Sequence, residues 1–296
     1  MIIPDSLKAG DKVAVVNPAK RLQSDMAAGL DLLKSWGLIP IVGENATKEH
    51  HLFAGTDEER LVDVQWAIDH PEVKAVIMAR GGYGTTRILD DLNFDKLVQY
   101  PKWLCGFSDI TSLLCRLDNL GIASMHSPMV ASFCRDSRSD ESVRKALMGE
   151  PLFYGLRSRK ENSPGKTEGS LIGGNLTMVC NSIGTASEID TDGKILFLEE
   201  VGEYIYHLDR MMVHLKRAGK LSKLAGVIIG DFSSMKDHND SFGYSTMEVL
   251  RSHLDALACP VVYGFPSGHE NHNLTLICGK QAWLEAGPEK TILRFQ

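Results

Sequence analysis

Residues 74–126 read KAVIMARGGYGTTRILDDLNFDKLVQYPKWLCGFSDITSLLCRLDNLGIASMH, and this stretch decides the fold class. It contains three apolar runs, KAVIMA (74–79), WLCGF (103–107) and IASMH (122–126). The amphipathic segment DITSLLCRLDNLG joins the last two runs. Short apolar runs that alternate with helical patterns at this spacing are typical of a parallel sheet. The stretch therefore predicts parallel strands connected by helices.

The same alternation extends toward the N-terminus. KVAVVN (12–17) and IPIVG (39–43) read as strands, and the segment AAGLDLLKSWG reads as the helix between them. Thr56 and Glu59 have the spacing of a capping box, which predicts that the next helix begins there. We therefore expect an α/β fold in which residues 1–150 form an N-terminal domain, a parallel sheet with helices on both faces.

The pattern weakens in residues 151–167, where Pro, Gly, Ser and charged residues are frequent, and this segment is predicted to be a linker. A Gly-rich turn follows at LIGGNL (171–176), and then a strand at KILFLEE (194–200). A helix in YIYHLDRMMVHLKRAG and strands in AGVIIGDF and PVVYGF come next. Residues 168–296 are therefore predicted to form a smaller, mixed α/β C-terminal domain.

The composition favours a folded protein that binds neither nucleic acid nor membranes. The net charge is −6 at pH 7, and no basic stripe runs along the chain, so nucleic acid is not an expected partner. Hydrophobic residues make up 43% of the chain, which is enough for a packed core. No apolar stretch approaches the roughly 18 residues that a spanning helix needs.

The N-terminus and the cysteines both point to the cytoplasm. Asp5 and Lys8 interrupt the first apolar run, so a secretory signal is not expected. The six cysteines, at positions 105, 115, 134, 180, 259 and 278, include no C-x-x-C pair. We expect free thiols packed as small hydrophobic side chains, and no structural zinc site.

Three segments with reactive side chains follow predicted strands, at the sheet edge where open α/β folds bind ligands. The first is RGGYG (80–84), whose three glycines let the backbone approach a ligand and whose N–H groups could hold an anion. A purely structural turn is an equally good interpretation, because the segment lacks the pattern of a phosphate-binding loop.

The second segment contains Ser108, which lies between the strand WLCGF and a helix. A serine at a strand-to-helix turn has the geometry of a nucleophile elbow, with free helix N–H groups beside a developing oxyanion. The alternative is that Ser108 only caps the helix. Ile110 stands where the elbow of α/β-hydrolases has its final glycine.

The third segment is divided between Glu199-Glu200, at the end of a predicted strand, and His269 in the loop GFPSGH. Each could be an ordinary solvated residue. A serine hydrolase, however, needs a base and a carboxylate that orients it, and the chain supplies one of each at strand ends. His272 is the next candidate for the base.

Six linked motifs make the chain resemble the LD-carboxypeptidases. They are ARGGYGTTRILDDLNFD, PKWLCGFSDITSLL, the HSPM segment at His126, LIGGNL, LFLEEVGEYIYHLDRMM and GFPSGHENHNLTL. This serine-peptidase family includes murein tetrapeptide carboxypeptidases and microcin C self-immunity peptidases. The resemblance covers nearly the whole chain. Ser127, His207 and Ile277 depart from the residues that are usual in the family.

The resemblance implies a role for individual residues. Ser108 matches the nucleophile, Glu199 the carboxylate of the triad and His269 the base. The oxyanion hole of the family matches the backbone amides of Asp109 and Gly82. No metal ion and no organic cofactor are implied.

A substrate with a free carboxylate also needs a positive or N–H-rich acceptor, for which Arg80 is a candidate. A structural ion pair is an equally good interpretation of this residue.

The resemblance also implies an activity and a partner. The expected reaction is hydrolysis of the L–D amide bond of murein tetrapeptide, a small muropeptide, which releases terminal D-Ala during cell-wall recycling by a homodimeric enzyme. One alternative is hydrolysis of a microcin-like peptidyl or aminoacyl nucleotide. The other is a non-catalytic α/β module that binds a ligand.

Overall fold

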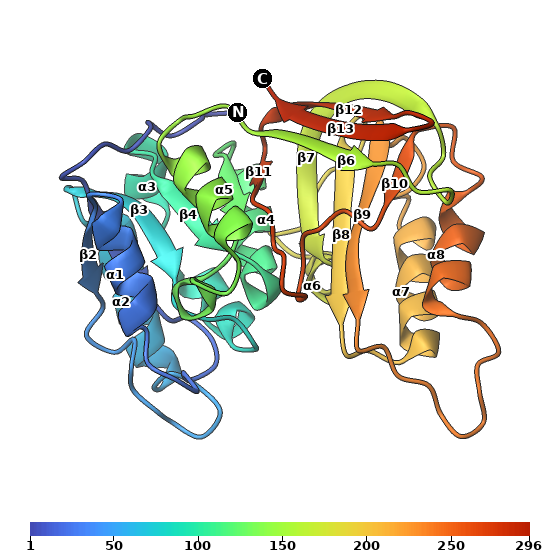
Figure 1. Cartoon of the computed structure of the whole chain (residues 1–296). Coiled ribbons are helices and arrows are strands. Elements are labelled where there is room, and N and C mark those ends of the chain that lie inside the picture. The colour runs from blue at the N-terminus through green and yellow to red at the C-terminus, as the bar shows by residue number, and fades with distance from the viewer.

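The computed structural model describes residues 1–296, whose strands form two sheets that lie side by side (Figure 1). The N-terminal half of the chain, blue to green in the figure, supplies the first sheet except for one strand. The C-terminal half, light green to red, supplies every strand of the second. This arrangement confirms the predicted α/β class.

The first sheet contains six strands in the order β11-β5-β4-β3-β1-β2. The first five strands along the chain run parallel, whereas β11 is antiparallel to β5. Their bounds are β1 (Lys12–Val16), β2 (Ile39–Val42), β3 (Val73–Met78), β4 (Trp103–Gly106), β5 (Ser124–His126) and β11 (Leu276–Cys278). The central strands are apolar runs buried on both faces, as is usual for parallel strands covered by helices.

Helices cover both faces of this sheet, as predicted. Apolar residues of α1 and α5 pack on one face, and those of α2, α3 and α4 pack on the other. Thr56 and Glu59 form both hydrogen bonds of the expected capping box at the start of α2. The helices are α1 (Ala27–Ser35), α2 (Asp57–Asp69), α3 (Asp95–Gln99), α4 (Thr111–Asn119) and α5 (Ser137–Leu147).

The second sheet is mixed and contains seven strands in the order β10-β9-β8-β7-β12-β13-β6. Strands β7 to β10 run parallel, and the remaining pairs are antiparallel. The bounds are β6 (Phe153–Arg157), β7 (Gly165–Asn175), β8 (Ile195–Val201), β9 (Gly226–Ser233), β10 (Val261–Tyr263), β12 (Gln281–Ala286) and β13 (Lys290–Phe295).

Three helices, α6 (Leu176–Ser182), α7 (Ile205–Arg217) and α8 (Thr246–Leu254), pack on one face of the second sheet. The other face shares a single apolar core with the first domain, in which Ile77 of β3 and Phe197 of β8 both take part. This common core holds the carboxyl ends of β4 and β8 in a fixed relation to each other.

The structure departs from the predicted organisation in three places. Residues 151–167, predicted as a linker, contain β6 and the start of β7. β6 is an edge strand with one neighbour, only part of which is buried, and the polar residues that suggested a linker follow it in the connection to β7. The three-residue β11 lies in the predicted C-terminal domain but pairs with β5 of the first sheet.

The third departure is LIGGNL, predicted as a turn, which instead completes β7. Gly173 lies against Phe197 of the neighbouring strand β8, and Gly174 lies close to the other domain. A Cβ on Gly174 would lie 2.5 Å from Oγ1 of Thr111, at the start of α4. The amide of Asn175 also donates to Thr111 Oγ1 at 3.0 Å.

Candidate active site

Ser108 lies at a strained turn between β4 and α4. Its backbone has φ +63°, in the left-handed region that non-glycine residues seldom adopt, at a cost of roughly 1–3 kcal/mol. A 3₁₀ turn over Ser108–Ile110 follows and leads directly into α4. Neither element begins with a side-chain cap, so Ser108 does not have the capping role that was the alternative.

Ser108, His269 and Glu199 form a continuous chain of hydrogen bonds. Ser108 Oγ lies 3.0 Å from His269 Nε2, and His269 Nδ1 lies 2.7 Å from Glu199 Oε2. If the Nδ1 proton is donated to the carboxylate, Nε2 can accept the proton of the serine hydroxyl. The three side chains come from the ends of β4 and β8 and from the loop after β10.

The neighbouring glutamates have different surroundings. The Glu199 side chain is 0% exposed and reaches His269, whereas Glu200 accepts hydrogen bonds from Asn175 Nδ2 and from the amide and hydroxyl of Thr177 at the start of α6. Burial raises the pKa of Glu200, although these donors oppose the shift. The structure thus directs Glu199 to the histidine and Glu200 to the helix.

The loop that carries His269 is braced from both domains. Asn273 Oδ1 accepts from the amide of Gly268 at 3.2 Å and lies 3.0 Å from Ser267 Oγ. The amide of Asn273 donates to Ser139 Oγ, in α5, at 2.8 Å. His272, the other candidate base, turns away and pairs with Asp136.

The environment of His269 favours its protonated form. Burial alone would lower the pKa of its ring, but the hydrogen bond and the negative charge of Glu199 outweigh burial and raise this pKa above its ordinary value. Asp231, in β9, adds a further negative charge. Burial raises the pKa of Asp231 to about 6.

Backbone amides near Ser108 are available for an oxyanion. Gly81 approaches the serine so closely that a Cβ on it would lie 3.2 Å from Ser108 Cβ. The amides of Gly81 and Gly82 donate to no backbone carbonyl outside the regular elements. The Asp109 carboxylate is buried and accepts from the Thr85 amide at 2.8 Å, so only the amide of Asp109 could serve the site.

A pocket of about 310 Å³ opens in front of Ser108, and we call it the serine pocket. Ser108 and His269 line it together with Gly82 and two arginines, Arg80 and Arg135. Arg80 forms no salt bridge. Its Nη1 instead donates to the carbonyl of Arg21 at 2.6 Å. Of the predicted site residues, only Glu199 and Asp109 do not line this pocket.

Sequence reasoning gave no role to His126 or Arg135, and both belong to this region. His126, at the end of β5, is fully buried, and burial lowers its pKa to about 4. Its ring contacts Phe107, which in turn contacts the His269 ring with 4.9 Å between centroids. The HSPM motif marked His126, but Arg135 stands in no motif.

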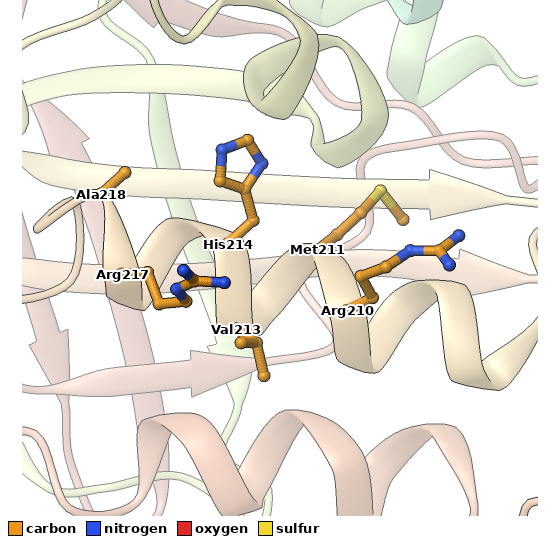
Figure 2. A pocket seen from close by; sticks show the side chains of 6 residues that line it. All are labelled: Arg210, Met211, Val213, His214, Arg217 and Ala218. Carbon is orange, nitrogen blue, oxygen red and sulfur yellow. The ribbon is translucent and has the colours of Figure 1, made fainter.

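A second hollow, of about 620 Å³, lies on the outer side of α7, and we call it the α7 hollow (Figure 2). All the residues that line it belong to α7 or directly follow it: Arg210, Met211, Val213, His214, Arg217 and Ala218. None of the residues predicted for catalysis is among them.

Two further observations concern metals and membranes. No three or more His, Cys, Asp or Glu side chains gather in a way that could hold a metal ion. None of the helices combines the length and apolar character required to span a bilayer.

The site defines a class of chemistry. A strained serine, a histidine within hydrogen-bond reach and a buried carboxylate behind it constitute the arrangement used for acyl transfer to serine. The class defined by fold and site is therefore that of a two-domain α/β hydrolase.

Comparison with known proteins identifies the family. Residues 13–127 match the model of the LD-carboxypeptidase N-terminal domain, and residues 168–284 match that of the LD-carboxypeptidase C-terminal domain. The chain therefore belongs to the LD-carboxypeptidase family of serine peptidases, which confirms the resemblance found in the sequence.

Individual relatives cover almost the whole chain. A probable murein peptide carboxypeptidase of Bacillus subtilis is 33% identical over 98% of this chain and 93% of its own length. The murein tetrapeptide carboxypeptidase of Pseudomonas aeruginosa is 31% identical over 93% of each chain. A more distant relative, the microcin C7 self-immunity protein of Escherichia coli, is 25% identical over 85% of this chain and 82% of its own.

A solved structure agrees with these relatives. The crystal structure of muramoyltetrapeptide carboxypeptidase from Oxalobacter formigenes has a TM-score of 0.87 and 32% sequence identity. The match covers 96% of this chain and 98% of that one.

Proposed function

We propose that this protein is a serine carboxypeptidase that hydrolyses the L–D amide bond of murein tetrapeptide and releases terminal D-Ala. The observation that carries the proposal is the hydrogen-bonded chain from Ser108 through His269 to Glu199 in a family of carboxypeptidases. The names of the Pseudomonas and Oxalobacter relatives support murein tetrapeptide as the substrate.

In the proposed mechanism, Ser108 Oγ attacks the carbonyl carbon of the L-configured residue while His269 takes the hydroxyl proton. Glu199 orients the imidazole and stabilises its charged form. The amides of Asp109 and Gly82 are the proposed donors to the tetrahedral oxyanion, each contributing about 3 kcal/mol.

His269 then gives the proton to the amine of the leaving D-residue, and the C–N bond breaks to leave an ester on Ser108. Water, deprotonated by His269, attacks this ester and releases the acid product. Arg80, in the serine pocket, is the proposed acceptor for a substrate carboxylate. Its lack of a salt bridge favours this role over that of a structural ion pair.

We further propose that the enzyme works as a homodimer in the cytoplasm. Family resemblance supports the dimer, and the six free cysteines fit a reducing compartment. Sedimentation of the purified chain tests the assembly.

The test of the activity compares two muropeptides by mass spectrometry. The purified protein should release D-Ala from the tetrapeptide and leave the D-Ala–D-Ala bond of the pentapeptide intact, because the acyl residue of that bond has the D configuration. Loss of the terminal D-Ala from pentapeptide at a comparable rate contradicts the proposal.

Similarity to the microcin C7 self-immunity protein supports a second candidate, hydrolysis of an aminoacyl nucleotide. The same assay with an aminoacyl-sulfamoyl adenosine distinguishes the two. Cleavage of this compound in preference to the tetrapeptide would favour the second candidate.

A further inference from the structure

We propose that Arg80 and Arg135 together form a receptor for the terminal carboxylate of the substrate, and that this receptor restricts cleavage to the last residue of a peptide. The inference rests on the proposed function and makes it more specific. It assigns a role to Arg135, a residue that stands in none of the sequence motifs.

The serine pocket carries positive charge without compensation. Arg80 and Arg135 both line it, and no Asp or Glu does. Neither arginine belongs to any of the salt bridges in the molecule, whereas Arg87 and Arg144 do. Guanidinium groups bind carboxylates through paired, charge-assisted hydrogen bonds, so two unpaired ones at the same pocket form an anion site.

The two arginines also act on each other. Partial burial and the neighbouring charge of Arg135 lower the pKa of Arg80. Arg80 is held in place by its hydrogen bond to the Arg21 carbonyl, which leaves its remaining N–H donors free. A bound anion would relieve the repulsion between the two cations, and this relief adds to the free energy of binding.

The location of the pair matches the geometry of an exopeptidase. The carboxylate of a terminal residue lies one residue beyond the scissile bond, a span of at most about 3.6 Å along the chain. A receptor for it must therefore line the same pocket as the nucleophile. Ser108, His269 and both arginines meet this condition.

The segments that present the arginines support this assignment. Arg80 follows β3 and lies two residues before Gly82, a proposed oxyanion donor, so carboxylate binding and oxyanion binding would use the same short segment. Arg135 lies between Val130–Ser132 and α5 and is exposed, so it can reach a ligand from the rim of the pocket.

The test combines changes in the enzyme with a change in the substrate, as in a double-mutant cycle. The tetrapeptide and its C-terminal carboxamide are hydrolysed by wild type, Arg80→Gln, Arg135→Gln and the double variant. Arg138→Gln, which removes a nearby exposed arginine outside the pocket, is the matched control. Thermal unfolding of each variant checks that it is folded. If Arg80→Gln does not fold, Arg80→Lys replaces it, because lysine keeps the positive charge but loses the paired hydrogen bonds of the guanidinium group.

We expect wild type to prefer the free acid to the amide by roughly 100-fold in kcat/KM. Each glutamine substitution should lower kcat/KM for the acid roughly 10- to 100-fold, mainly through KM, and leave the amide nearly unchanged. The double variant should hardly distinguish the two, and Arg138→Gln should behave as wild type. Equal losses on acid and amide, or no loss at Arg135→Gln, overturn the inference.

A binding experiment separates this inference from the proposed function. Ser108→Ala removes turnover, so calorimetry can compare acid and amide directly. If wild type hydrolyses neither compound, the substrate assignment fails. A preference of Ser108→Ala for the acid that disappears in Ser108→Ala/Arg135→Gln would still support the receptor, and equal binding of acid and amide would refute it.

Discussion

The serine pocket and the α7 hollow each contain two arginines, yet their construction differs. Residues 79–82, the turn at Ser108, the segment before α5 and the loop of His269 all contribute to the serine pocket, whereas the α7 hollow is lined along a single helix (Figure 2). The α7 hollow is the larger of the two, about 620 Å³ against about 310 Å³.

The comparison shows how a catalytic site differs from a merely concave surface. Catalysis needs reactive groups held in fixed mutual positions by rigid elements, and several segments that converge on one point provide this. Exposed arginines spaced along one helix commonly form its solvent-exposed face and need no ligand to explain them. Of these two, volume alone would have favoured the α7 hollow, and the number of arginines would not have distinguished them.

The largest expected effect tests the chemistry of the serine pocket. Ser108→Ala should lower kcat on the tetrapeptide by at least about 10³-fold, because the substitution removes the nucleophile. The fold should remain, and relief of strain is not expected, since alanine also disfavours φ +63°. Circular dichroism and a D-Ala release assay measure the two properties.

Near-wild-type turnover by Ser108→Ala would mean that another group carries out the reaction. Labelling of wild type, but not of the variant, by a fluorophosphonate probe provides an independent control.

Glu199→Gln should have the next largest effect, a loss of about 10²–10⁴-fold in kcat. Glutamine keeps the size of the side chain but removes the negative charge that raises the pKa of His269. His269 acts as a base only when neutral, so wild-type kcat/KM should fall as the pH drops through this raised pKa. In the variant, the acid limb should move to lower pH.

The pH profile of kcat/KM for both enzymes is the measurement. An acid limb that does not move, with an otherwise similar loss, would show that Glu199 does not set the protonation of His269.

Much of this arrangement could be predicted from the sequence because local rules decide it. The capping box at Thr56 and the alternation of apolar runs with helical patterns depend on neighbouring residues, and the structure contains both. The pairing of β11 with β5 could not be predicted in this way, because it depends on residues about 150 positions apart.

The same distinction applies to the site. Ser108, Glu199 and His269 stand in motifs, and the structure brings their side chains together. Arg135 reaches the serine pocket only through the path of the chain between β5 and α5, which no local pattern encodes. Glycines 173 and 174 predict a turn but lie in β7, because the close approach of Gly173 to Phe197 of β8 and of Gly174 to Thr111 of α4 also requires glycine.

Glu200→Gln should affect stability more than catalysis, in contrast to its neighbour. Glu200 accepts from Asn175, from the Val201 amide and twice from Thr177, and an amide group would place donors against donors. We expect the free energy of unfolding to fall by about 1–3 kcal/mol. The value of kcat/KM should stay within roughly threefold, because His269 keeps its partner.

Urea unfolding and the D-Ala assay measure these two quantities on one protein sample. A larger catalytic loss in Glu200→Gln than in Glu199→Gln would reverse the proposed roles of the two carboxylates.

The smallest expected effect belongs to the α7 hollow. Arg210 and Arg217 form no salt bridge, and both side chains are exposed on a helix whose opposite side, with Leu208 and Met212, packs in the core. Arg210 lies over the Tyr206 ring at 5.4 Å, a contact that contributes about 0.5–1 kcal/mol at an exposed site. The double variant Arg210→Gln/Arg217→Gln should therefore lose at most this much stability and keep kcat/KM for the tetrapeptide within about twofold of wild type.

The substitutions that remove two guanidinium groups from the serine pocket should, by contrast, abolish discrimination between the free acid and the carboxamide of the tetrapeptide. A tenfold loss in the α7 variant would mean that positive charge acts on the substrate from a distance, and raising the ionic strength would then reduce wild-type activity as well.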